Sequence, residues 1–157
     1  MDYSFKIINS SAGSGKTFKL AIEYISKLFS KKNDEHFKSM LALTFTNKAS
    51  AEMKYRILLY LNDLKYQSNK IVLDEILKIT GLDESTIQKR SSTILEKILY
   101  NYSNFNVITI DSFTNNIIKT VNAELENKDD FLVEFDNQIY IDQAVEELIS
   151  EINEDKE

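Results

Sequence analysis

Hydrophobic residues follow two patterns that alternate along the chain. Three short stretches, residues 5–9, 40–45 and 105–110, are almost continuously apolar and have the length of strands. After each stretch and a short loop, apolar residues recur at intervals of three and four, as on one face of a helix. Continuous apolar runs are typical of parallel strands that are buried on both faces. The alternation therefore predicts an α/β fold with a parallel sheet and flanking helices.

Residues 62–104 interrupt this alternation, because they show helical spacing without a run of strand length. One helix is expected over about 71–79, ended by Gly81 in the left-handed conformation of a helix C-cap. A second helix is expected over about 84–101, from the spacing of its apolar residues. The segment is therefore predicted to be a helical insertion.

The remaining residues divide into two parts around this insertion. Residues 1–61 and 105–127 contain the three strand–helix units and are expected to form one sheet-containing lobe. Residues 128–157 form an acidic segment, in which 131–135 alternates like a short strand. Its stretch 138–152 has the spacing of an amphipathic helix, so the segment is expected to be mainly helical.

The loop after the first apolar stretch has the pattern of a phosphate-binding loop. Its residues are Ser10, Ser11, Ala12, Gly13, Ser14, Gly15, Lys16 and Thr17. Backbone N–H groups of such a loop, together with the helix that follows, can surround a phosphate chain. Lys16 supplies an ammonium group for the outer phosphates, and the Thr17 hydroxyl is placed to ligate Mg²⁺. Ser10 stands where the general pattern has glycine. The alternative is a strand-to-helix connection of small residues that binds no ligand.

Composition narrows the class of protein. The chain has 157 residues, of which 43% are hydrophobic and 28% charged, as in a globular domain. No apolar run is long enough to span a bilayer, and residues 1–4 lack the features of a signal peptide. The absence of cysteine excludes disulfides and thiolate metal sites. A cytoplasmic protein without a membrane partner is therefore expected.

Charge is distributed unevenly along the chain, whose net charge is −6. Residues 1–60 contain ten Lys and Arg against five Asp and Glu, whereas residues 121–157 contain two against thirteen. The first part could contact a phosphate backbone, and the last part could not. A nucleic-acid partner is therefore compatible with the first part only.

Three segments at the ends of the apolar stretches together resemble the N-terminal part of UvrD-like superfamily 1 DNA helicases. They are residues 10–17, the run Thr-Phe-Thr-Asn-Lys-Ala-Ser-Ala-Glu-Met at 44–53, and Thr-Ile-Asp-Ser-Phe at 109–113. The last segment is most similar to the RecB/AddA-type helicase–nuclease branch. The resemblance covers nearly the whole chain. It implies a P-loop, RecA-like motor lobe of an ATP-dependent helicase, belonging to a helicase–exonuclease of double-strand break repair that translocates on single-stranded DNA.

The resemblance also implies a role for each motif. Lys16 and Thr17 would hold the ATP phosphates and Mg²⁺ as the catalytic residues of this lobe. The residues implied to contact single-stranded DNA are Phe45, Thr46, Asn47, Lys48, Ser112 and Phe113. An aromatic ring offers a stacking surface for a base, and a lysine suits phosphate oxygens. The alternatives are that Phe45 is a core residue at the end of a strand and that Lys48 is merely solvated.

Two other interpretations remain open. Asp111 ends a mostly apolar stretch and could be the acidic Mg²⁺ ligand of a small P-loop NTPase or phosphotransferase. The third possibility is an interaction module without catalysis. Under the helicase interpretation, an acidic Mg²⁺-binding motif, an arginine finger and a second motor lobe are missing. The chain is then expected to be the N-terminal piece of a longer protein, inactive alone, whose partners include a second helicase–nuclease subunit.

Overall fold

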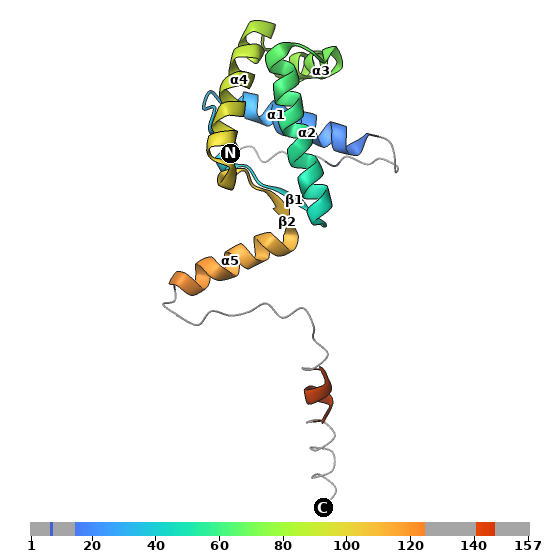
Figure 1. The fold of residues 1–157 in the computed structure, drawn as a ribbon, viewed down its shortest axis with the longest axis vertical. Helices are drawn as coiled ribbons and strands as arrows, with labels where there is room; N and C mark the ends of the chain where they lie inside the picture. The colour runs from blue at the N-terminus through green and yellow to red at the C-terminus, as the bar shows by residue number, and fades with distance from the viewer. Residues whose placement is uncertain (1–6, 8–14, 125–140, 147–157) are drawn as a thin grey trace, which may run out of the picture. The chain divides into compact units, whose positions relative to one another are not determined.

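The computed structural model describes residues 7, 15–124 and 141–146 (Figure 1). Residues 1–118 form one compact unit and residues 119–157 a second. The helices are α1 (Lys16–Ser30), α2 (Asn47–Tyr66), α3 (Lys70–Thr80), α4 (Glu84–Tyr100) and α5 (Ile110–Glu124). The strands are β1 (Ala42–Thr44) and β2 (Val107–Thr109), and 3₁₀ turns lie at His36–Ser39 and Tyr102–Asn104. Residues 141–146 are helical.

The helices of the predicted insertion begin and end at residues that satisfy unpaired backbone groups. Asn69 caps α3 by accepting a hydrogen bond from the Val72 N–H, and Asp83 caps α4 in the same way. Gly81 follows α3 with φ 66°, and its N–H donates to the Leu77 carbonyl. The expected pair of helices and the glycine C-cap are therefore confirmed.

Helices α1 to α4 share one hydrophobic core, in which α2 packs along α4 and α1 contacts both α2 and α3 (Figure 1). The predicted insertion contributes to this core through residues that are completely buried: Val72, Ile76, Ile87, Ile94 and Ile98. Each such side chain stabilises the fold by roughly 1.5–3 kcal/mol. The division of the chain into a motor lobe and an insertion stays a prediction, but the helices of residues 62–104 pack directly on α1 and α2.

The sheet described by the structure has two parallel strands. Ala42 pairs with Val107, Leu43 with Ile108 and Thr44 with Thr109. Three helices separate these neighbouring strands in the sequence, and α2 packs on both of them. Of the predicted α/β fold, the described residues thus show a parallel sheet of two strands in a mostly helical unit.

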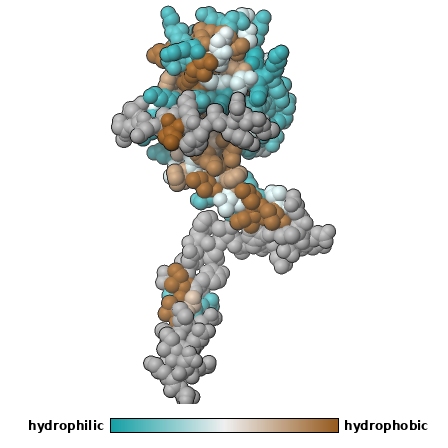
Figure 2. Space-filling view, turned by 180° about the vertical axis from the view of Figure 1, so that it is seen from behind, coloured by the Kyte–Doolittle hydropathy of each residue, from teal (hydrophilic) through white to brown (hydrophobic). Residues whose placement is uncertain are grey.

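The expectation that residues 40–45 form a strand buried on both faces is wrong. Leu41 is 46% exposed, Leu43 45% and Phe45 87%, whereas Val107 and Thr109 in β2 are buried. Alternate residues of a strand point to opposite faces of a sheet. In the described part of the chain α2 covers one face, so the apolar run keeps half of its side chains near solvent. Figure 2 shows apolar patches among the hydrophilic surface on one face of the first unit.

Several expected elements cannot be compared with the structure. Of the predicted strand at 5–9 the structure describes Ile7, which has no regular secondary structure. The alternating stretch 131–135 lies outside the described residues, and of the predicted helix 138–152 only 141–146 is described. Among the helices that are described, none has both the length and the apolar character needed to cross a membrane.

Candidate nucleotide and nucleic-acid sites

The start of α1 has the backbone that a phosphate-binding loop requires. Gly15 immediately precedes the helix with φ 78° and ψ 25°, in the left-handed region. A Cβ atom added to Gly15 would meet nothing within 4 Å, so space is not what requires glycine here. The positive φ is the reason, because an L side chain in this conformation costs about 1–2 kcal/mol.

The first turn of α1 is arranged for an anion. No described side chain caps the helix, and the first turn contains no acidic residue. Lys16 and Lys19 lie there instead, close to the positive end of the helix dipole, which is unfavourable for the helix alone. Helix α4 has the opposite arrangement, since Asp83 caps it and Glu84 lies in its first turn. A bound phosphate would satisfy the free N–H groups of α1 and offset both lysine charges.

The described part of the loop supplies donors that fit a magnesium–nucleotide complex. Lys16 is exposed and free to reach a phosphate, and Thr17 is half-buried. A single hydroxyl is a sufficient protein contribution to Mg²⁺, which usually keeps phosphate oxygens and waters as its other ligands. Residues 10–14 of the loop lie outside the described residues. No cluster of three or more His, Asp or Glu side chains that could hold a metal ion occurs in the described ranges.

A turn fixed by two threonines follows β1. The Thr44 hydroxyl donates to the Thr46 carbonyl at 3.1 Å, and Thr46 Oγ1 accepts from the Ala49 N–H at 3.1 Å. Thr46 is thereby the N-cap of α2. Between the two threonines, Phe45 projects into solvent with 87% of its surface exposed. Phe45 is therefore not part of the hydrophobic core of the described unit.

The start of α2 has the charge expected of a phosphate contact. Asn47 and Lys48 are exposed, and the first turn of α2 holds no acidic residue. The N-terminal end of a helix carries partial positive charge, which adds to the charge of Lys48. The exposed ring of Phe45 and these polar groups thus lie in consecutive positions on one turn.

A second hydroxyl pair fixes the turn after β2. Thr109 is 6% exposed, and its hydroxyl lies 2.8 Å from the Ser112 hydroxyl. Thr109 Oγ1 also accepts from the Ser112 N–H at 3.2 Å, which is the N-cap arrangement for α5. Ser112 is half-buried and its hydroxyl already has a partner. Thr44 and Thr109 are paired in register, so the structure brings the two predicted contact segments to one edge of the sheet.

Phe113 differs from Phe45 in its surroundings. Phe113 is half-buried and lines a groove of about 310 Å³ with Leu41, Ile108 and Asn106, among others. Leu41 and Asn106 precede the two strands, whereas Phe45 follows β1. The structure therefore places Phe113 against the sheet and does not present its ring to solvent as it does that of Phe45.

Asp111 lies in the first turn of α5 and is exposed. Strand β2 ends at Thr109, so Asp111 is a helical residue and not the last residue of the strand. A carboxylate in the first turn of a helix complements the helix dipole. This interaction explains an aspartate at position 111 without a metal ion.

Sequence reasoning missed residues that hold these segments in place. Thr109 could have been found, because a threonine at a strand end, three residues before the helical N–H of Ser112, is an N-cap signal. The hydrogen bond from the Thr44 hydroxyl to the Thr46 carbonyl has no comparable signal in the sequence. The role of Arg90 could not have been found from the sequence, because no local pattern joins it to its partners. Asp34 and Phe29 lie about sixty residues away from Arg90 in the sequence.

The amino-acid sequence of the chain is similar to those of known helicase proteins. Residues 4–157 match the family described as the UvrD/REP helicase N-terminal domain. The chain is 31% identical over 150 residues to an ATP-dependent helicase/nuclease subunit of Clostridium botulinum (strain Okra / Type B1). The aligned region covers 94% of this chain and 10% of that protein. It is 33% identical over 133 residues to the RecBCD enzyme subunit RecB of Buchnera aphidicola subsp. Baizongia pistaciae (strain Bp), covering 76% and 11%. The chain thus spans about a tenth of the length of these relatives. No solved structure matches it.

Proposed function

Because the chain belongs to the UvrD/REP helicase family, by a domain match over residues 4–157, we propose that it is the ATP-binding N-terminal lobe of an ATP-dependent DNA helicase. The parent protein translocates on single-stranded DNA and acts as a helicase–exonuclease in double-strand break repair. Two relatives support this branch of the family, since one is named as a helicase/nuclease subunit and the other as RecB of a RecBCD enzyme. The proposal therefore includes a second helicase–nuclease subunit. It also includes a cytoplasmic location, where ATP and DNA are both present.

The uncapped first turn of α1 carries the proposal. Backbone N–H groups of residues 10–17 surround the phosphates of ATP, and the Gly15 backbone supplies the turn into the helix. Lys16 binds the outer phosphates, where it stabilises charge during hydrolysis. Thr17 ligates Mg²⁺ through its hydroxyl. Hydrolysis of the bound nucleotide supplies the free energy for movement along DNA.

The turn after β1 supplies the first part of the proposed DNA contact. Phe45 stacks on a base, an interaction that does not depend on base identity. Thr46, Asn47 and Lys48 contact the phosphate backbone at the start of α2. The fixed turn and the exposure of Phe45 support this role, since the backbone is already in place and the face of the ring is accessible to a base.

Ser112 and Phe113 extend the proposed DNA contact from the neighbouring strand. The pairing of Thr44 with Thr109 supports this, because both segments start at one edge of the sheet. The contact requires an adjustment at the start of α5, since the Ser112 hydroxyl bonds to Thr109 and Phe113 lines the groove beside the sheet. Phe45 is therefore the stronger of the two aromatic contacts in this proposal.

The isolated chain binds nucleotide weakly and hydrolyses little of it under this proposal. It corresponds to about a tenth of the relatives' length, and a helicase motor needs a second lobe to close on ATP. Catalytic activity and DNA unwinding therefore belong to the full-length parent.

Replacement of Lys16 in the full-length parent tests the assignment. Lys16→Ala removes the phosphate-binding ammonium and should reduce ATP-dependent unwinding by roughly a hundredfold or more. Binding of single-stranded DNA should change little. Lys27→Ala is the matched control, because Lys27 is an exposed lysine in the last turn of the same helix, at the end opposite to the proposed phosphate site. Unwinding that survives Lys16→Ala would show that this lobe is not the motor's nucleotide site.

The competing phosphotransferase hypothesis needs arginines for a second phosphate group. The chain has two arginines, and both are engaged within the described unit. Arg56 bonds to Glu52 within α2, and Arg90 bonds to Asp34 and to backbone carbonyls. This weighs against the small P-loop phosphotransferase with Asp111 as its Mg²⁺ ligand.

A further inference from the structure

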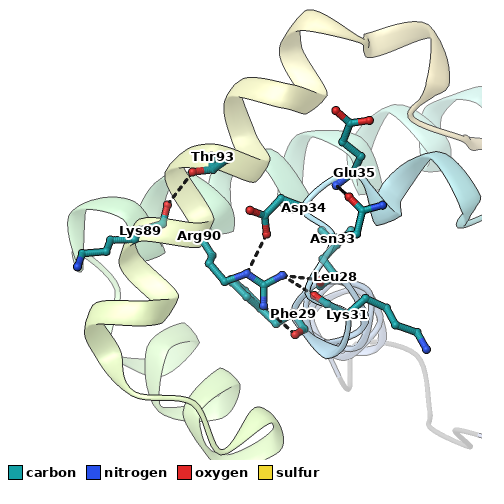
Figure 3. Close-up of polar contacts among 9 residues, drawn as sticks. All are labelled: Leu28, Phe29, Lys31, Asn33, Asp34, Glu35, Lys89, Arg90 and Thr93. Atoms are coloured by element: carbon teal, nitrogen blue, oxygen red, sulfur yellow. Dashed lines mark hydrogen bonds and ion pairs between the residues drawn. The ribbon is translucent and has the colours of Figure 1, made fainter.

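Arg90 of α4 reaches across the unit to the C-terminal end of α1 (Figure 3). Its Nε donates to Asp34 Oδ1 at 2.8 Å, which forms an ion pair. Its Nη1 donates to the Phe29 carbonyl at 2.9 Å, and its Nη2 donates to the Lys31 carbonyl at 2.6 Å. The guanidinium carbon also lies 5.4 Å from the centre of the Phe29 ring. Nη1 and Nη2 are thus directed at carbonyls at the end of α1, and Nε is directed at Asp34 in the segment that follows the helix.

These contacts supply what the end of α1 otherwise lacks. The last carbonyls of a helix have no partner within the helix. Helix α1 ends at Ser30, and Lys31, which follows it, has an extended conformation. A cation near these carbonyls also complements the negative end of the helix dipole. The side chains of Arg90 and Asp34 are 18% and 22% exposed, so solvent screens the pair less than it screens a surface ion pair.

A second ion pair from α4 holds the same connection. Lys97 Nζ lies 3.6 Å from Glu35 Oε1, next to Asp34 in the sequence. Arg90 and Lys97 are seven residues apart on α4, and residues seven apart lie on one helical face. This face therefore fastens residues 31–35 at two points. That segment connects α1, which starts at the proposed nucleotide site, to β1, which ends at the proposed DNA contact.

We propose that Arg90 is a positioning residue for nucleotide binding, through which α4 fixes α1 and its connection to β1. The inference rests on the proposed function, since it takes the first turn of α1 as the phosphate site. The body of α1 is buried, with Ala21, Ile25 and Leu28 at 0–1% exposure. A helix embedded in this way transmits a restraint at its last turn to its first turn. Phosphate at one end and the guanidinium at the other then complement both poles of the same helix dipole.

Nucleotide affinity of the 157-residue chain measures this effect. A fluorescent ATP analogue with Mg²⁺ is titrated at a temperature well below the midpoint of thermal unfolding, after circular dichroism has confirmed the helical content. Arg90→Ala should raise the Kd by roughly fivefold or more. Arg56→Ala is the matched control, because it removes an arginine whose contacts stay within α2, and it should leave the Kd unchanged. Asp34→Asn, a milder change, should raise the Kd less than Arg90→Ala.

Hydrogen exchange separates positioning from general stability. Addition of the analogue should slow exchange of the amides of residues 31–35 in the unaltered chain, since restraint between two ends of a helix is reciprocal. Arg90→Ala should abolish this slowing at residues 31–35. Arg90→Lys should restore only part of it, because a compact ammonium group lacks the planar fork whose separate nitrogens reach Asp34 and the two carbonyls.

The outcomes distinguish this inference from the proposed function. An unaltered chain that binds no analogue would overturn the nucleotide site itself. An unaltered chain that binds, with Arg90→Ala and Asp34→Asn binding equally well, would overturn the positioning role even if both variants unfold at lower temperature.

Discussion

Thr44 is paired with Thr109 in the parallel register of β1 and β2, and each threonine hydroxyl fixes the turn that follows its strand. Thr44 bonds to the Thr46 carbonyl, and Thr109 caps α5 through the Ser112 N–H. Two segments that lie more than sixty residues apart in the sequence are thereby held at one edge of the sheet. This is the relationship on which a DNA contact shared by the two strands depends.

Phe45 gives the most direct test of that contact. Phe45→Ala should weaken binding of a single-stranded oligonucleotide by the full-length protein, at a cost of about 1–3 kcal/mol per stacked base. The thermal midpoint should stay within experimental error, because the ring is 87% exposed. Tyr100→Ala is the matched control, since Tyr100 is an aromatic residue with 89% exposure at the end of α4. Fluorescence anisotropy with a labelled oligonucleotide measures the affinity, and equal losses in both variants would argue against a specific role for Phe45.

Thr109 is predicted to stabilise the start of α5. Thr109→Val keeps the shape of the buried side chain but removes the hydroxyl that accepts from the Ser112 N–H. The free energy of unfolding should fall by about 1 kcal/mol, the usual cost of losing an N-cap. Urea denaturation of the 157-residue chain measures this. Thr93→Val should have little effect, because the Thr93 hydroxyl bonds to a carbonyl within an exposed part of α4. A loss as large for Thr93→Val would contradict the capping role.

The sequence predicted the helices and the segments of the candidate site, because those depend on local patterns. The Gly81 C-cap and the helix expected over about 84–101 both follow from residues close together in the sequence. The burial of residues 40–45 was predicted wrongly, since a continuous apolar run does not reveal how many faces of its sheet are covered. Arg90 could not be assigned either, because its contacts depend on how α4 lies against α1. Long-range packing is the part that no local pattern contains.

Asp83 predicts one component of the dependence of stability on pH. Hydrogen bonds from the Thr86 side chain and backbone lower the pKa of Asp83 below its ordinary value of 3.8. A carboxyl group whose pKa is lower in the folded state stabilises the fold above its ordinary pKa, and this contribution is lost as the pH falls through the folded-state value. Asp83→Asn keeps an N-cap but cannot titrate, so its thermal midpoint should fall less steeply below pH 3.8.

Thr86→Val supplies the control for Asp83. The variant removes the hydroxyl that donates to Asp83 Oδ2 at 2.6 Å, while the Thr86 N–H still donates to Oδ1. The pKa of Asp83, followed by NMR, should therefore rise part of the way toward its ordinary value. An unchanged pKa in Thr86→Val would show that the hydroxyl is not the main cause of the shift.

Asp111 separates the helicase lobe from a complete small NTPase. Asp111→Ala in the full-length protein should leave ATP hydrolysis nearly unchanged, because Asp111 is an exposed residue of the first turn of α5 and β2 ends two residues earlier. Stability should fall by at most about 1 kcal/mol, from the lost interaction with the helix dipole. Lys16→Ala serves as the positive control, since it should abolish hydrolysis under either hypothesis. Clear Mg²⁺-dependent hydrolysis by the isolated 157 residues, lost in Asp111→Ala, would favour the small NTPase, in which this carboxylate holds the metal ion.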